Sequence, residues 1–118
     1  MQRALTLKQN TEFHRAYGRG KVKASPMLVT YAVKNRGQGV RLGITAAKKL
    51  GSAVERNRCR RIIRAAFSSI YPHCSGNFDI VFVARFKTKK LKSSDLVPVM
   101  RQHLTELGVV RDGAGADF

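Results

Sequence analysis

The sequence predicts an α+β fold, a two-layer sandwich in which helices pack on a sheet. Segments with apolar residues at helical spacing alternate with segments of β-branched and aromatic residues at strand spacing. Clusters of Gly, Pro, Asn and Ser separate these segments. The length of 118 residues suits one hydrophobic core. We therefore expect one domain over residues 1–110, with the element order α-β-β-β-α-β-α, and a disordered Gly/Ala/Asp-rich tail over residues 111–118.

A short first helix is expected over about residues 7–17. Thr6 and Gln9 have the spacing of a capping box at its start. Phe13 and Tyr17 lie four residues apart and therefore share one face of this helix. That spacing favours packing in the core. The basic residues around them leave base stacking open as the alternative.

Four strands are expected. Residues 21–25 resemble a short edge strand, and residues 27–34 form a stronger strand with apolar residues on both faces. Residues 40–46 read as the return strand of a hairpin, and Gly43 within them indicates a bulge or a close backbone approach. Residues 78–86 are the most apolar, which predicts an interior position in the sheet.

A long helix is expected to begin after Ser52, a residue type that caps helices well. A last helix is expected from Ser93 or Ser94 to about Leu107, after a basic linker over residues 87–92. The long helix has an apolar stripe that predicts the face packed on the sheet. The stripe contains Cys59, Ile62, Ile63, Ala66, Phe67 and Ile70.

The charge is the most unusual feature of the composition. The chain has 23 Lys and Arg against 7 Asp and Glu, a formal net charge of +16. A small domain with this self-repulsion needs an anionic partner, of which nucleic acid is the first candidate and an anionic membrane the second. No apolar run approaches the roughly 20 residues of a membrane span, and the N-terminus lacks the apolar core of a signal peptide. We therefore expect a cytoplasmic protein that does not associate with membranes.

Much of this charge is concentrated on the long helix and the loop before it. Like charges four residues apart cost a few tenths of a kcal/mol each, and the helix dipole disfavours cations in the first turns. Binding phosphate recovers this cost, and the planar fork of Arg suits phosphate well. The candidate nucleic-acid contacts on this segment are Lys48, Lys49, Arg56, Asn57, Arg58, Arg60, Arg61 and Arg64.

The sequence contains no recognisable catalytic triad, phosphate-binding glycine loop or carboxylate pair, and its dispersed acids do not suit a two-metal nuclease. Cys59 and Cys74, with the histidines, match no zinc spacing. A metal-free ribonuclease that uses His14, His73 or His103 stays open as an alternative, although lone histidines in a basic protein are more often surface residues. The residues therefore favour a binding protein with no catalytic residue, bound metal or cofactor of its own.

Residues 41–67, RLGITAAKKLGSAVERNRCRRIIRAAF, resemble the signature of the protein subunit of bacterial ribonuclease P. That signature is a strand ending in R-x-G-x-[ST], followed by K-K-x-G-N-A-V-x-R-N-R-x-[KR]-R-x-x-R. Ser52 stands where Asn is usual, and Ala47 where Ser is usual. The matched positions are Arg41, Gly43, Thr45, Lys48, Lys49, Gly51, Ala53, Val54, Arg56, Asn57, Arg58, Arg60, Arg61 and Arg64.

The resemblance covers about residues 5–107 and implies a fold and a function. The implied fold has a four-stranded mixed sheet and a left-handed strand–helix–strand crossover, as in the second domain of a small-subunit ribosomal protein. The implied function is that of a subunit in an RNA–protein enzyme that removes the 5′ leader from precursor tRNA. The catalytic centre and its Mg²⁺ ions would belong to the RNA subunit, with one protein bound to each RNA.

The resemblance also implies roles for particular residues. The basic residues of the long helix and its preceding loop would contact the catalytic RNA. A cleft between the first helix and the sheet would hold the leader, which reverses the preference for Phe13 and Tyr17 as core residues. The residues implied to line this cleft are Phe13, Tyr17, Tyr31 and Lys48. The alternative is a general structural RNA-binding protein, ribosomal or chaperone-like, which explains the charge but not the motif.

Overall fold

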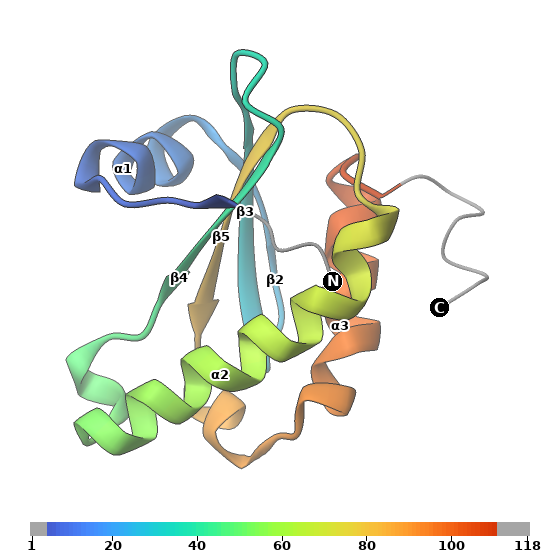
Figure 1. The fold of residues 1–118 in the computed structure, drawn as a ribbon. Helices are drawn as coiled ribbons and strands as arrows, with labels where there is room; N and C mark the ends of the chain where they lie inside the picture. Colours follow the sequence, from blue (N-terminus) through green and yellow to red (C-terminus); the bar gives the residue numbers. More distant parts are fainter. Residues whose placement is uncertain (1–4, 111–118) are drawn as a thin grey trace.

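The computed structural model describes residues 5–110, which form helices on both sides of one sheet (Figure 1). The tail expected over residues 111–118 lies outside the described residues. The elements in chain order are β1 Leu5–Thr6, α1 Asn10–Arg19, β2 Lys21–Ala24, β3 Leu28–Lys34, β4 Val40–Thr45, the 3₁₀ turn η1 Lys48–Leu50, α2 Ala53–Ile70, the 3₁₀ turn η2 Tyr71–His73, β5 Phe78–Ala84, the 3₁₀ turn η3 Phe86–Lys90 and α3 Ser93–Glu106.

The sheet is mixed, as expected, but it has five strands and not four. Its order is β1-β4-β5-β3-β2, with β5 antiparallel to β3 and parallel to β4. The additional strand is β1, where Leu5 and Thr6 pair in parallel with Arg41 and Leu42. Two residues are too short to show a strand period in the sequence. The remaining order, α-β-β-β-α-β-α, is confirmed.

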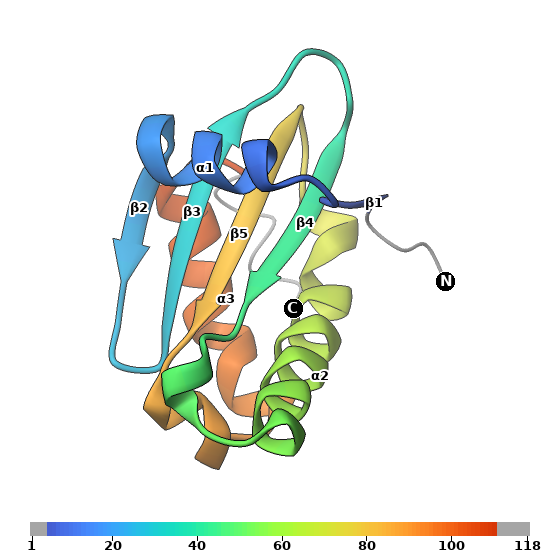
Figure 2. The same ribbon diagram turned by 90° about the vertical axis from the view of Figure 1, so that its left-hand side faces the viewer.

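The crossover from β4 through α2 to β5 is left-handed, as the resemblance implied. Figure 2 views the sheet from the side that α1 crosses, with α2 behind the sheet. β4 and β5 both run downward in this view, and β5 lies to the left of β4. The general rule for parallel strands predicts the opposite hand. The hand matters for function because it decides which face of the sheet α2 covers.

The sheet and the helices α2 and α3 make the two main layers, while α1 crosses the opposite face (Figure 2). The larger core cluster lies between the sheet and α2 and α3, and includes the buried rings of Phe67 and Phe82 at a centroid distance of 5.6 Å. The apolar stripe predicted for α2 is confirmed, although Ile62 is only half-buried. The buried members of the stripe are Cys59, Ile63, Ala66, Phe67 and Ile70.

Helix α1 begins at Asn10, three residues later than expected, and the capping box predicted from Thr6 and Gln9 is wrong. The Glu12 carboxylate accepts hydrogen bonds from the backbone N–H groups of Lys8 and Gln9, both at 3.0 Å. The helix cannot begin at Leu7, because β1 and the bond from the Leu7 N–H to the Leu42 carbonyl hold the chain against β4 up to that residue. The acid inside the first turn therefore caps α1.

The N-cap expected for α2 is confirmed. The Ser52 hydroxyl accepts a bond from the Glu55 backbone N–H at 3.2 Å, and the Glu55 carboxylate accepts one from the Ser52 N–H at 3.0 Å. In α3 the N-cap is Lys92, and not either of the two serines that follow it. There the Asp95 carboxylate accepts from the Lys92 N–H at 2.8 Å. Both long helices are thus closed by an acid in the first turn.

His103 lies on the buried face of α3, which corrects the expectation that the histidines lie on the surface. Its Nδ1 atom lies 2.9 Å from the Thr30 hydroxyl of β3. Burial is the main cause that lowers the pKa of His103; the charge of Lys23 acts in the same direction, and that of Glu106 opposes it. His14, by contrast, is exposed on α1.

We expect the free energy of unfolding to decrease as the pH falls below about 6.5, the ordinary pKa of histidine. The unfolded chain then takes up a proton that the buried imidazole resists, so protonation favours unfolding. Urea unfolding at neutral and mildly acidic pH measures this loss. His103→Gln should weaken the pH dependence, and His14→Gln should leave it intact. An equal pH dependence in wild type and His103→Gln would contradict the assignment.

Candidate nucleic-acid interface

The sheet face beneath α1 is built in three rows of side chains, because β4, β5 and β3 pair in register. Side chains at alternate positions of a strand share one face, so every second residue faces α1. In the order of residues along β4, the rows across β4, β5 and β3 are Arg41, Asp79 and Val33, then Gly43, Val81 and Tyr31, then Thr45, Val83 and Val29.

The first row carries a network of charged side chains centred on Asp79, whose side chain is 1% exposed. Arg41 binds it with two bonds, from Nε to Oδ1 and from Nη2 to Oδ2, both at 2.7 Å. Asn35 donates to Oδ1 at 2.8 Å, and Arg15 Nη1 lies 3.8 Å from Oδ2. Arg41 Nη1 also lies 2.9 Å from Glu12. The network therefore ties α1 to β4, β5 and the turn after β3.

Both carboxylates of this network are held in the charged form. Burial acts to raise the pKa of Asp79, but the hydrogen bonds from Arg41 and Asn35 outweigh burial and lower it. The pKa of Glu12 is lowered first by the backbone N–H groups at the start of α1, and further by Arg41. The network is therefore complete at neutral pH.

The second row positions the aromatic side chains. A Cβ atom at Gly43 would lie 2.7 Å from the Cε1 and Cζ atoms of Phe13, so only glycine lets this ring lie on the strand. The close approach expected at Gly43 is confirmed. Tyr17 meets Tyr31 edge to face, with ring centroids 5.0 Å apart. The Tyr17 hydroxyl lies 2.6 Å from the hydroxyl of Thr45 in the third row. The structure thus brings the three predicted aromatic residues to one face.

The third row lies beyond α1. In Figure 2, α1 crosses the upper part of the sheet, and the lower part of this face has no helix over it in the described chain. Thr45, Val83 and Val29 are half-buried there, next to the 37% exposed Tyr17. Lys48 is exposed in η1, three residues after Thr45, at the lower end of β4. Within the described residues, no hydrogen bond or cation–π contact joins Lys48 to the three aromatic residues.

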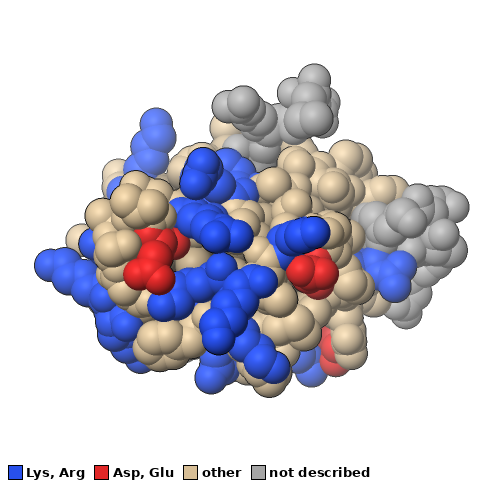
Figure 3. All heavy atoms as spheres, turned by 90° about the horizontal axis from the view of Figure 1, so that it is seen from below, with Lys and Arg blue, Asp and Glu red and all other residues tan. Residues whose placement is uncertain are grey.

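The predicted basic residues lie on α2 and the turn before it. Asn57 accepts a hydrogen bond from Arg60 Nη1 at 2.9 Å, which fixes one guanidinium on the helix surface. Figure 3 shows Lys and Arg side chains gathered at the end of the molecule where α2 begins, with few acids among them. Arg56 and Arg60 are half-buried. The exposed members are Lys48, Lys49, Asn57, Arg58, Arg61 and Arg64.

The turn before α2 is held rigidly. Gly51 has φ +141°, and a Cβ atom there would meet the Glu55 carboxylate. Lys89, from η3, donates to the Leu50 carbonyl at 2.6 Å and lies 3.3 Å from Glu55 Oε2. This contact could not be predicted from the sequence, because the sequence indicates only a basic linker over residues 87–92. The two exposed lysines of η1 are therefore presented on a fixed turn.

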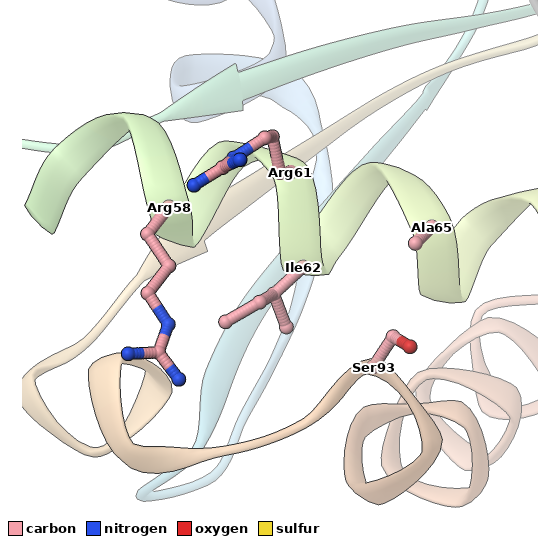
Figure 4. A pocket seen from close by; sticks show the side chains of 5 residues that line it. All are labelled: Arg58, Arg61, Ile62, Ala65 and Ser93. Atoms are coloured by element: carbon pink, nitrogen blue, oxygen red, sulfur yellow. The ribbon is translucent and has the colours of Figure 1, made fainter. Parts of the chain in front are cut away.

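A shallow cavity of about 280 Å³ opens between α2 and the start of α3. Figure 4 shows Ile62 pointing from α2 toward the start of α3, with Arg58 beside it reaching toward the preceding loop. The cavity is smaller than pockets for drug-sized ligands, which typically have volumes of about 300–1,000 Å³. It combines an apolar floor with two guanidinium groups. Its lining residues are Arg58, Arg61, Ile62, Ala65 and Ser93.

The residues suggested for other chemistries do not come together. His14 on α1 and His103 on α3 lie on opposite sides of the sheet. Within residues 5–110 there is no group of three or more His, Cys, Asp or Glu that could hold a metal ion. The helices described by the structure include none long and apolar enough to cross a membrane.

Comparison with known proteins assigns the family. The family model described as Ribonuclease P matches residues 1–108, nearly the whole chain. This chain belongs to the ribonuclease P protein family. Family membership places it among RNA-binding components of ribonucleoproteins that act in tRNA processing.

Relatives of known sequence and structure agree with this assignment. The ribonuclease P protein component of Clostridioides difficile is 38% identical over 91 residues, which are 76% of this chain and 80% of that protein. The ribonuclease P protein of Staphylococcus aureus has a structure that matches with a TM-score of 0.79 at 32% identity, over 92% of this chain and 100% of that one. The Thermotoga maritima ribonuclease P protein matches with a TM-score of 0.71 at 25% identity, over 86% and 94% of the two chains.

The network around Asp79 is the functional-face feature that sequence reasoning missed in this ribonuclease P protein. One signal could have found it. Asp79 is the single acid in the most apolar strand, between Phe78 and Ile80. A lone acid at an interior strand position requires a buried partner. The sequence does not identify that partner, since Arg41 lies 38 residues away.

We expect Asp79→Asn to lower the free energy of unfolding by about 1.5–3 kcal/mol, the range for a hydrogen bond to a charged group. Arg41 would lose its buried anionic acceptor. Glu106→Gln is a matched control, because Glu106 pairs with Lys23 where both side chains are 43% exposed, and it should cost less than about 1 kcal/mol. Urea unfolding at neutral pH compares the two variants. Equal losses would show that the network does not hold the fold.

Proposed function

We propose that this protein assists the catalytic RNA of ribonuclease P in removing the 5′ leader from precursor tRNA, and that it breaks no bond itself. The observation that carries the proposal is the separation of two surfaces on one domain. The matched basic motif lies on α2 and η1, and the aromatic residues lie on the sheet face crossed by α1. One surface suits a folded RNA and the other suits a single strand.

The catalytic RNA binds the surface formed by α2 and η1. The exposed arginines of α2 offer planar forks that take phosphates bidentately, and the lysines of η1 add point charges on a rigid turn. The bond between Asn57 and Arg60 supports this role, because it fixes a guanidinium before the RNA arrives. Positioning of the RNA is therefore the contribution expected from this surface.

The leader of precursor tRNA binds on the α1 face. Tyr17 is the exposed member of the aromatic group, and its contacts with Tyr31 and Thr45 hold its ring in one orientation. A fixed aromatic ring accepts bases of any identity, which suits leaders of varied sequence. Phe13 supports this surface from beneath α1, and Lys48 supplies positive charge where the uncovered sheet ends.

The chemical step belongs to the RNA subunit in this proposal. The described acids are dispersed or used in caps and ion pairs, and they form no carboxylate cluster of the kind that Mg²⁺ prefers. The RNA subunit would supply the Mg²⁺ sites, and no step is assigned to a metal on the protein. One protein would bind one RNA, and the cytoplasm would be the compartment in which it meets precursor tRNA.

Reconstitution tests the proposal. The protein is mixed with a bacterial ribonuclease P RNA and precursor tRNA at low Mg²⁺, where RNA alone cleaves slowly. We expect faster leader removal with the protein than without it, because the protein neutralises and positions the two RNAs. If the rate with protein equals that of RNA alone, the proposal fails.

Arg58→Ala should weaken binding to the catalytic RNA and make its salt dependence shallower. Each phosphate contact contributes to the slope of log affinity against log salt, by roughly 0.7 to 0.9. Titrations at several salt concentrations measure both quantities. Arg36→Ala is the matched control, since Arg36 is exposed on the hairpin turn at the other end of the molecule. A slope that is unchanged in Arg58→Ala would mean that Arg58 contacts no phosphate.

Tyr17→Ala should weaken binding of precursor tRNA to the holoenzyme by about 1–3 kcal/mol, the value of one stacked base, and leave mature tRNA unaffected. Tyr17→Phe is the control, because it keeps the ring and removes only the bond to Thr45. Binding of both tRNAs to holoenzymes assembled with each variant measures the difference. An equal effect on the two tRNAs would show that Tyr17 does not touch the leader.

A further inference from the structure

We propose that residues 86–92 form a second contact surface for the catalytic RNA, in which the Phe86 ring stacks on an unpaired base. In this surface Lys87, Lys90 and Lys92 contact the phosphates beside that base. The inference rests on the proposed function, since the RNA concerned is the one that binds α2. It adds a site outside the basic motif.

The segment is an ordered turn whose inner residues are anchored in the fold. Thr88 is fully buried, and its hydroxyl donates to the Met27 carbonyl at 2.7 Å. The same hydroxyl accepts from the Arg85 N–H at 2.9 Å. Leu91 is half-buried against the main core. A turn held at these points loses little conformational freedom on binding, which favours affinity.

The outer residues of this turn face solvent. Phe86 is 58% exposed, so packing in the main core does not explain why an aromatic residue stands at this position. Lys89 Nζ lies 5.5 Å from the centroid of that ring, a cation–π distance that holds the ring in place. Lys87 and Lys90 are exposed, and within the described chain no ion pair to either is recorded. An exposed, fixed aromatic ring among unpaired lysines is the combination that binds single-stranded nucleic acid.

Continuity with α2 points to the same RNA as the partner. Lys89 connects the turn to Leu50 and Glu55, at the start of the α2 surface. The cavity between α2 and Ser93 lies along the same side of the molecule (Figure 4). Figure 3 shows several groups of basic side chains spread over this end of the molecule, with few acids between them. A folded RNA that covers the α2 arginines therefore also covers residues 86–92. An anionic membrane surface could also attract exposed lysines and an aromatic ring, but it would not explain this continuity.

The affinity of the full-length protein for a bacterial ribonuclease P RNA tests the inference at several salt concentrations. Phe86→Ala should lower affinity roughly 5-fold to 140-fold, because stacking is worth about 1–3 kcal/mol and about 1.4 kcal/mol corresponds to a tenfold change. The salt slope should be unchanged, because stacking releases no counterions. Phe86→Tyr should retain the affinity. Lys87→Gln and Lys90→Gln should instead make the slope shallower by roughly 0.7 to 0.9 each.

Leu5→Ala is the control for loss of an exposed apolar side chain, because Leu5 is 61% exposed in β1, away from η3. It should leave RNA affinity unchanged. If wild type does not bind the RNA, the proposed function itself fails. If wild type binds and Phe86→Ala binds equally well, only the second surface is overturned. Binding of wild type to phosphatidylserine vesicles that Phe86→Ala abolishes, with RNA affinity unchanged, would also overturn it.

Discussion

The buried ion pair between Asp79 and Arg41 is the interaction on which the α1 face depends. It joins β4 to β5, and through Glu12 and Arg15 it fixes α1 over the sheet. A buried pair of this kind contributes more to geometry than to net stability, because desolvation offsets much of its attraction. With α1 held in this way, the rings that α1 carries have one position on the sheet. The proposed leader surface is therefore set by side chains that would not touch the leader.

The left-handed crossover separates this surface from the basic one. It carries α2 to the sheet face opposite α1, so the helix with the basic motif and the helix with Phe13 and Tyr17 lie on opposite faces of the sheet. Under the proposed function, two RNA segments would then bind at once, and Lys48 in η1 is the one side chain assigned to both surfaces. Among the described residues, Glu55 and Asp95 cap helices and Glu55 also pairs with Lys89. The large excess of positive charge is left to a partner.

Local patterns in the sequence were sufficient where the interactions are local. The Ser52 cap and the stripe of α2 could be predicted because they depend on neighbours within a few turns. β1 could not be predicted, because a strand of two residues shows no periodicity. The ordered turn η3 could not be predicted either, because Thr88 and Lys89 hold it through hydrogen bonds to residues 61 and 39 positions away. The hand of the crossover came from the family resemblance alone. The charge pattern indicated nucleic acid as the partner of the basic residues, whereas the leader-binding roles came from that resemblance. The structure adds which of these residues lie together.

Photo-crosslinking in the reconstituted holoenzyme tests the separation of the two RNA surfaces most directly. A photoreactive nucleotide is placed either in the leader of precursor tRNA or in the catalytic RNA, and the crosslinked peptides are mapped. Leader crosslinks should fall on residues 10–19 and 28–34, which form α1 and β3. Crosslinks from the catalytic RNA should fall on residues 48–64, in η1 and α2, and on the second contact surface over residues 86–92. Leader crosslinks confined to α2 would contradict the two-surface arrangement.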